Sequence, residues 1–194
     1  MLDAGYNWRT AKISPDLDGF QKHVIKQVKS GFLWTGSLAY YIKDYYGIGL
    51  TFQQFGASYE VFGEMNGQTG VLKISDRITF IGPAFAIQAP LRNSDWIVDL
   101  SMSIGFMGYV SKIKFPNYNR TASGATFGSQ TAIGLSYKFT PQWAIGLKLQ
   151  TASGILTQYT EEINGHKTTV TFEPKKGESL AQFGISLGVR YYIK

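Results

Sequence analysis

The chain has 194 residues, a formal net charge of +6 and a pI near 9.4. This length predicts a single domain covering residues 1–194. The basic balance suits an anionic partner, but charged residues make up only 16% of the chain and no run of Lys or Arg occurs, which argues against a nucleic-acid-binding protein. The absence of Cys excludes disulfides and thiolate metal sites, and we expect neither a cofactor nor a metal.

No apolar run is long enough for a transmembrane helix. A signal peptide is not evident either, because residues 1–6 already alternate between apolar and polar or small side chains as a strand does. If the protein is exported, we therefore expect this chain to be a mature form from which the signal has been removed.

The first quarter of the chain predicts strands with a two-residue period. The first strand covers residues 2–9, and the polar segment 12–30 is a long loop. Two further strands, 32–42 and 46–53, are joined by a short turn. The alternation slips at Gln54-Phe55, which predicts a β-bulge.

The middle of the chain continues the same pattern. The segment 62–76 is predicted to be a second long loop or an exposed hairpin tip. Strands follow at 81–88 and 96–107, with a short turn between them. Residues 112–125 are predicted to be a third long connection.

The last third contains the strongest hairpin signal, Asn164-Gly165. Before it lie a strand at 130–139 and a strand pattern from 143 to 163, separated by a tight turn. After it, residues 168–172 lead back toward the last strand, 180–193.

The last strand has two very different faces. One carries bulky apolar side chains and the other mostly small or polar ones: Phe183, Ile185, Leu187, Val189, Tyr191 and Ile193 against Gln182, Gly184, Ser186, Gly188, Arg190 and Tyr192. A water-exposed sheet face is rich in Lys, Glu and Thr rather than Gly. A narrow barrel with lipid outside and a crowded polar lumen requires this asymmetry.

The chain thus has about eight strands, with connections that alternate between short and long. The alternative is a soluble, lipocalin-like barrel with its apolar face inward. That barrel would need to hold roughly forty large side chains in a lumen that eight strands leave just wide enough for side chains. We therefore predict an all-β fold, an eight-stranded antiparallel up-and-down transmembrane β-barrel, with the termini and short turns at the periplasmic end.

Residues 186–193 resemble the C-terminal sorting signal of bacterial outer-membrane barrels, carried here by Gly188, Tyr191 and Ile193. Lys194 follows, where members of that family often end on an aromatic residue. The whole chain resembles small eight-stranded outer-membrane proteins of the OmpW and OmpX type, with short turns in the style common in Bacteroidetes. The resemblance implies a location in the bacterial outer membrane, contact with outer-membrane lipids and lipopolysaccharide, and recognition by the barrel-assembly machinery. Association with other outer-membrane proteins stays open.

Charged residues that point into a narrow lumen need partners. The alternation turns six of them inward: Arg9, Lys138, Lys148, Arg190, Asp3 and Asp99. If the strands on either side of the third long connection pair about a centre between Tyr118 and Asn119, Asp99 faces Lys138. Closure of the barrel similarly brings Asp3 toward Arg190.

These two pairs are predicted to plug the periplasmic end. Arg9 and Lys148 lie higher, and their polar neighbours are expected to be Gln130, Gln150 and Gln182. We therefore expect no continuous water channel. The alternative is an open pore lined by water-exposed charges.

Pro83, preceded by Gly82, lies in the middle of a predicted strand and cannot donate a ladder hydrogen bond. It predicts a local break or bulge. Resemblance to OmpW-type barrels implies a lateral opening there, through which an apolar solute leaves the lumen; a silent bulge is the alternative.

Little in the chain suggests catalysis. The two histidines, His23 and His166, both fall at the predicted exterior end, where a general base toward lipid A could lie, but no nucleophile motif accompanies either. We expect a non-enzymatic outer-membrane barrel, either a structural and surface-interaction protein or a narrow conduit for small apolar molecules. The alternatives are a subunit of a larger outer-membrane complex and a lipid A-modifying enzyme.

Overall fold

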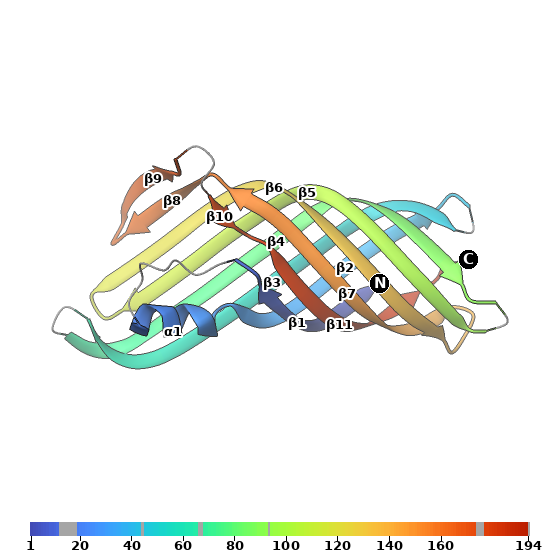
Figure 1. The fold of residues 1–194 in the computed structure, drawn as a ribbon, viewed down its shortest axis with the longest axis horizontal. Helices are drawn as coiled ribbons and strands as arrows, with labels where there is room; N and C mark the ends of the chain where they lie inside the picture. Colours follow the sequence, from blue (N-terminus) through green and yellow to red (C-terminus); the bar gives the residue numbers. More distant parts are fainter. Residues whose placement is uncertain (12–18, 44, 66–67, 93, 174–176, 194) are drawn as a thin grey trace.

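The computed structural model describes residues 1–11, 19–43, 45–65, 68–92, 94–173 and 177–193. Eight antiparallel strands form a closed barrel: β1 (Leu2–Arg9), β2 (Ser30–Tyr41), β3 (Tyr46–Met65), β4 (Gln68–Pro90), β5 (Trp96–Phe115), β6 (Tyr118–Lys138), β7 (Trp143–Leu156) and β11 (Gln182–Tyr191). Strand β11 closes the barrel by pairing with both β7 and β1. The predicted fold class is confirmed. Both termini lie toward one end, which we call the proximal end; the opposite end is the distal end (Figure 1).

The barrel wall is much taller on one side than on the other. Strands β3 to β6 have 20 to 23 residues each, whereas β1, β2, β7 and β11 have 8 to 14. The tall strands extend past the short ones at the distal end (Figure 1). The predicted long connection 112–125 is wrong, because most of its residues belong to β5 and β6. For residues 62–76 the loop alternative is wrong and the hairpin alternative is right, since β3 and β4 pair out to Met65 and Gln68.

The apolar face of the tall strands changes sides along their length. On the proximal side, large apolar side chains such as Ile48 and Leu50 point outward and are exposed. The register then aligns an outward apolar row at which the continuous apolar outer surface ends: Phe52, Ile81, Phe106 and Phe127. Beyond this row most apolar side chains point inward and are buried, as Phe55, Ile78 and Met107 are, whereas Phe62 and Val71 near the distal tip point outward and are exposed. Such a switch is expected where the surroundings of a barrel wall change from lipid to water.

This switch also explains the slip in the alternation at Gln54-Phe55. Strand β3 pairs with β4 from Tyr46 opposite Ile87 to Met65 opposite Gln68, with no extra residue on either strand. The predicted β-bulge is therefore wrong: the backbone continues unchanged, and only the side that carries the apolar residues differs.

A helix lies within the predicted long loop 12–30. Helix α1 (Gly19–Gln27) begins near the distal end and packs alongside β3 (Figure 1). Val24 in the helix and Val28 just after it are four residues apart, a spacing that places both on one helix face, and both are buried in a cluster with Phe55, Ile78 and Met107. The distal lumen is therefore filled by an apolar core. Among the residues described, no helix is long and apolar enough to cross a membrane.

A hairpin projects beside β6 at the distal end. It consists of β8 (Gln158–Ile163) and β9 (His166–Thr171), and β8 pairs with β6. Its turn residues have positive φ, 48° at Asn164 and 90° at Gly165, so the predicted Asn164-Gly165 hairpin is confirmed. Glu161 forms an ion pair with Arg120 of β6, and although burial lowers the pKa of Arg120, this hydrogen bond and charge raise it above its usual value. A short strand, β10 (Glu178–Ser179), pairs with β7.

Candidate functional site

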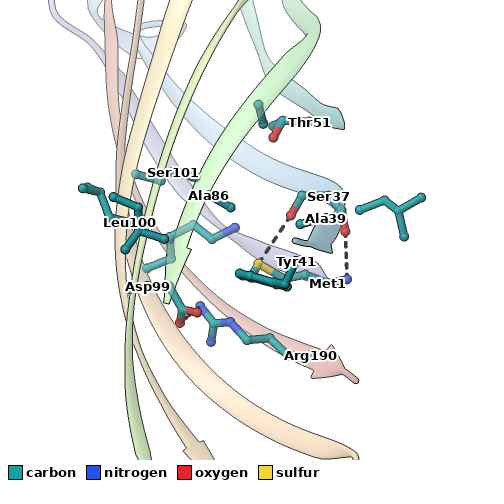
Figure 2. A pocket seen from close by; sticks show the side chains of 16 residues that line it. Met1, Ser37, Ala39, Tyr41, Thr51, Ala86, Asp99, Leu100, Ser101 and Arg190 are labelled. Carbon is teal, nitrogen blue, oxygen red and sulfur yellow. Dashed lines mark hydrogen bonds and ion pairs between the residues drawn. The ribbon is translucent and has the colours of Figure 1, made fainter. Parts of the chain in front are cut away.

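The proximal lumen holds a layer of buried charges from four strands. Arg190 of β11 forms an ion pair with Asp99 of β5 at 3.1 Å, and Lys148 of β7 pairs with Asp3 of β1. Ser136 donates a hydrogen bond to Asp99, at 2.8 Å. The side chain of Arg190 is only 3% exposed. Figure 2 shows the charged groups of Asp99 and Arg190 turned toward each other.

Two glycines make the Asp99–Arg190 pair possible. The guanidinium of Arg190 extends over Gly146 of β7 and Gly134 of β6 to reach Asp99. A Cβ at Gly146 would overlap Nη1 of Arg190, and a Cβ at Gly134 would lie 2.7 Å from Nη2. The missing side chains therefore create the path along which the arginine lies.

The predicted pairs Asp99–Lys138 and Asp3–Arg190 are wrong, although the prediction that these acids point inward is right. The turn between β5 and β6 is at Pro116-Asn117, two residues before the assumed centre, so Asp99 faces Gly134 instead of Lys138. The ammonium of Lys138 instead lies 4.5 Å from the centre of the Tyr192 ring, at the proximal rim. Asp3 lies opposite Gly188 in the β1–β11 pair, and its ion-pair partner is Lys148 instead of Arg190.

Above the charges lies a layer of amide side chains. Gln130 donates a hydrogen bond to Gln53 at 2.8 Å, and Gln150 donates to Thr35 at 3.2 Å. Gln182 accepts a hydrogen bond from Asn7. The predicted inward position of Gln130, Gln150 and Gln182 is correct, but they bond within their own layer and not to Arg9 or Lys148.

A second charge layer lies between the amides and the distal core. Arg9 donates to Asp76 at 2.9 Å and to Glu178 at 2.7 Å, and its guanidinium lies 5.4 Å from the centre of the Tyr109 ring. Sequence reasoning missed Asp76 and Glu178 because both fell in segments assigned to loops. The alternation of Ile74, Asp76 and Ile78 could have revealed that Asp76 shares an inward face.

A small cavity lies beside the proximal charges. Its volume is about 50 Å³, and it is lined by residues that include Tyr41, Ser101, Lys148 and Arg190 (Figure 2). A volume of this size holds only a few water molecules. The lumen is therefore layered from proximal to distal end as charges, amides, charges and an apolar core.

The predicted lateral opening at Gly82 and Pro83 is wrong. The β4–β5 register is the same on both sides of this point, with Ile81 opposite Phe106 and Ala84 opposite Ser103, so there is no bulge. The predicted local break is confirmed, because the β4–β5 pairing is interrupted between these two pairs. Gly82 lies against Gly105 of β5 so closely that a Cβ on Gly82 would be 2.8 Å from the Cα of Gly105. The absence of an amide hydrogen on Pro83 is accommodated by this close glycine contact, and the two strands do not separate.

The residues of the predicted sorting signal point in different directions. Gly188 faces the lumen, where a Cβ would collide with the carboxylate of Asp3. Tyr191 points outward and packs against Trp143, with ring centres 4.8 Å apart, and Ile193 is highly exposed. Gly188 thus has a packing role in the barrel in addition to its predicted role in sorting.

The histidines do not come together with catalytic partners. His23 lies on α1 with its ring 6.3 Å from that of Tyr59, and His166 is exposed at the start of β9. Glu162 is 3.7 Å from Lys167 within the hairpin. Within the described part of the chain, no three His, Cys, Asp or Glu residues are grouped so that they could hold a metal ion.

Comparison with known proteins gives relatives by structure only. No protein-family profile matches the chain, and no curated protein matches it. The structure is similar to Neisserial surface protein A (TM-score 0.54, 13% identity, 99% of this chain and 94% of that one). It is also similar to a major outer membrane protein from Thermus thermophilus (TM-score 0.62, 10% identity, 98% of both chains).

A third similar structure is Ail, the attachment invasion locus protein of Yersinia pestis, in complex with the heparin analogue sucrose octasulfate (TM-score 0.50, 15% identity, 98% of this chain and 95% of that one). At these identities the comparisons establish the fold alone. This chain has the fold of the small outer-membrane β-barrels of bacteria.

Proposed function

We propose that this protein is an integral outer-membrane barrel without enzymatic activity, whose role is structural or surface-binding instead of conducting. One observation supports the proposal: among the described residues, layers of paired charges, bonded amides and an apolar core follow one another along the lumen. A conduit for apolar molecules would need a path through these layers or a side exit, and the strands are closed at Gly82 and Pro83.

We call the exposed apolar surface between the proximal end and the row of Phe52, Ile81, Phe106 and Phe127 the apolar belt. The same proposal places this belt in the hydrocarbon of the outer membrane and the distal end outside the cell. The tall wall and the β8–β9 hairpin then project from the surface. Lipids and lipopolysaccharide would surround the belt, and the barrel-assembly machinery would read Gly188, Tyr191 and Ile193. Kinship with OmpW-like or OmpX-like proteins, or with those of Bacteroidetes, remains part of the proposal.

A role as subunit of a larger outer-membrane complex is the second candidate, and the edge of the hairpin favours it. In the described sheet, β9 is the terminal strand, so one row of its backbone N–H and C=O groups is free to pair with another extended segment. Co-purification in mild detergent tests this candidate: a partner lost when residues 158–171 are replaced by a short turn supports it, and a solitary barrel contradicts it.

Recording from planar bilayers tests the main proposal. The refolded protein, shown to be folded by its heat-sensitive migration on a gel, should give no steady conductance steps. Large, steady conductance would overturn the proposal of a closed lumen. Mass spectrometry of lipid A from cells with and without the protein tests the enzymatic alternative, and we expect identical profiles.

A further inference from the structure

The outer wall of the barrel carries a polar groove just distal to the apolar belt. It spans β3, β4 and β5, has a volume of about 480 Å³, and is lined by Gln54, Gly56, Ser58, Ser75, Arg77 and Lys112, among others. Its lining also includes Ala57 and Asp76, two buried residues that alternate with the outward-facing ones.

The strand register fixes the height of the groove relative to the belt. The row that ends the apolar belt contains Phe52, Ile81 and Phe106. The next outward row on these strands is Gln54, Thr79 and Gly108, then Gly56, Arg77 and Val110, then Ser58, Ser75 and Lys112. Arg77 is thus four residues beyond Ile81 on the same strand. At roughly 3.3 Å per residue, and with the strands tilted, this is about 10 Å past the hydrocarbon edge.

Absent side chains form the floor of the groove. A Cβ built on either Gly56 or Gly108 would meet nothing within 4 Å, so both glycines border open space. Neither is required by a positive φ. Gly56, which is paired with Arg77, therefore helps to make the surface concave, and Gly108 leaves open space in the neighbouring row.

The charges in the groove are uncompensated. Among the residues that the structure describes, neither Arg77 nor Lys112 forms an ion pair, whereas Lys73, one row further out, is paired with Glu60. Asp76 also lines the groove, but its carboxylate is already paired with Arg9. Two exposed cations on diagonal positions, with hydroxyl groups from Ser58 and Ser75 beside them, match the chemistry of a phosphate ester.

We infer that this groove binds the phosphorylated headgroup of an outer-leaflet glycolipid of the lipid A type. The occupant follows from position: at this height on the outer wall, the phosphates of the surrounding outer leaflet are the anions in contact with the barrel, and both cations can bend toward them. The inference rests on the proposed outer-membrane location, and it names the lipid partner and its site.

The test measures binding of the full-length refolded protein in detergent to bisphosphorylated lipid A, to the same lipid after removal of its phosphates, and to inorganic phosphate. Wild-type protein should bind the bisphosphorylated lipid at least about tenfold more tightly than the dephosphorylated one. R77Q/K112Q should lose this preference. K43Q/R92Q, which removes two exposed charges at the proximal end, should retain it.

A second variant tests the shape of the groove independently of charge. Gly56→Val fills open space without a backbone collision, so the barrel should fold normally and yet bind the bisphosphorylated lipid several-fold more weakly. Equal binding by R77Q/K112Q and K43Q/R92Q would overturn the inference, as would equal binding of the two lipids. Inorganic phosphate that binds as tightly as the lipid would overturn the lipid assignment. A barrel that does not insert into lipid at all refutes the proposed location instead.

Discussion

The buried guanidinium of Arg190 depends on residues that contribute no side chain. It crosses two strands to reach Asp99, and the space it occupies exists because Gly146 and Gly134 have no Cβ. Buried ion pairs are costly to desolvate, so their stability depends on geometry and on further hydrogen bonds such as that from Ser136. Small residues on the lumen face therefore have a structural purpose beyond reducing bulk.

Gly146→Ala should destabilise the barrel, by about 1–3 kcal/mol, because its Cβ would overlap Nη1 of Arg190 and lie 2.6 Å from Oγ of Ser136. Urea unfolding in micelles measures the change. Gly36→Ala is the control: its Cβ would be 3.7 Å from Leu2, an ordinary contact, and stability should hardly change. Equal losses from the two substitutions would argue against the packing described.

The partner of Asp99 can be identified by a double-mutant cycle. Asp99→Ala and Arg190→Ala should each cost about 3–5 kcal/mol, because each leaves a buried charge unpaired, and the double variant should cost much less than their sum. The same cycle with Lys138→Ala should show coupling near zero, since Lys138 lies over Tyr192 at the rim. Strong coupling to Lys138 would restore the pair expected from sequence.

At the scale of strands and helices, the tall wall has to satisfy two environments with one continuous backbone. Its proximal half presents apolar side chains to the outside, and its distal half turns them inward around Val24 and Val28 of the α1 region. Alternation in the sequence reveals the strands in either half. The point at which the apolar face changes sides marks the boundary of the belt.

This reversal explains which parts of the fold could be predicted. Eight strands, the closed barrel and the inward set Arg9, Asp3, Asp99, Lys148 and Arg190 follow from the two-residue period alone. The distal halves of β3 to β6 were not predicted as strands, because their outward residues, such as Ser58 and Lys112, are polar like those of loops. Pairing of the lumen charges also could not be predicted, since it depends on turn positions and on the reach of long side chains over glycine.

A matched pair of arginine substitutions on one face of β3 tests the boundary. Leu50→Arg places a charge within the belt and should cost about 2–4 kcal/mol, which lowers the folded fraction in lipid vesicles. Ser58→Arg, on the same face but beyond Phe52, should fold as the wild type does. If both variants fold equally well, the belt does not end at the row of Phe52 and Ile81.

At the scale of the whole molecule, the barrel is polarised along its axis. The proximal end has short turns and both termini, and the distal end has the tall wall, helix α1 and the β8–β9 hairpin (Figure 1). Short turns add little polar surface that has to cross the membrane during insertion. The distal elements, in contrast, have exposed polar surfaces suited to water. Insertion should therefore leave the short turns inside and the hairpin outside.

The absence of Cys makes this orientation measurable with single-cysteine variants. Thr169→Cys places a thiol on exposed β9, and Arg92→Cys places one in the exposed turn between β4 and β5. A membrane-impermeant maleimide should label Thr169→Cys on intact cells, and it should label Arg92→Cys only after the outer membrane is permeabilised. Both substitutions lie outside the lumen layers, so folding should be unaffected. Labelling of Arg92→Cys alone on intact cells would reverse the orientation and move the groove beside Arg77 to the inner leaflet, away from lipid A.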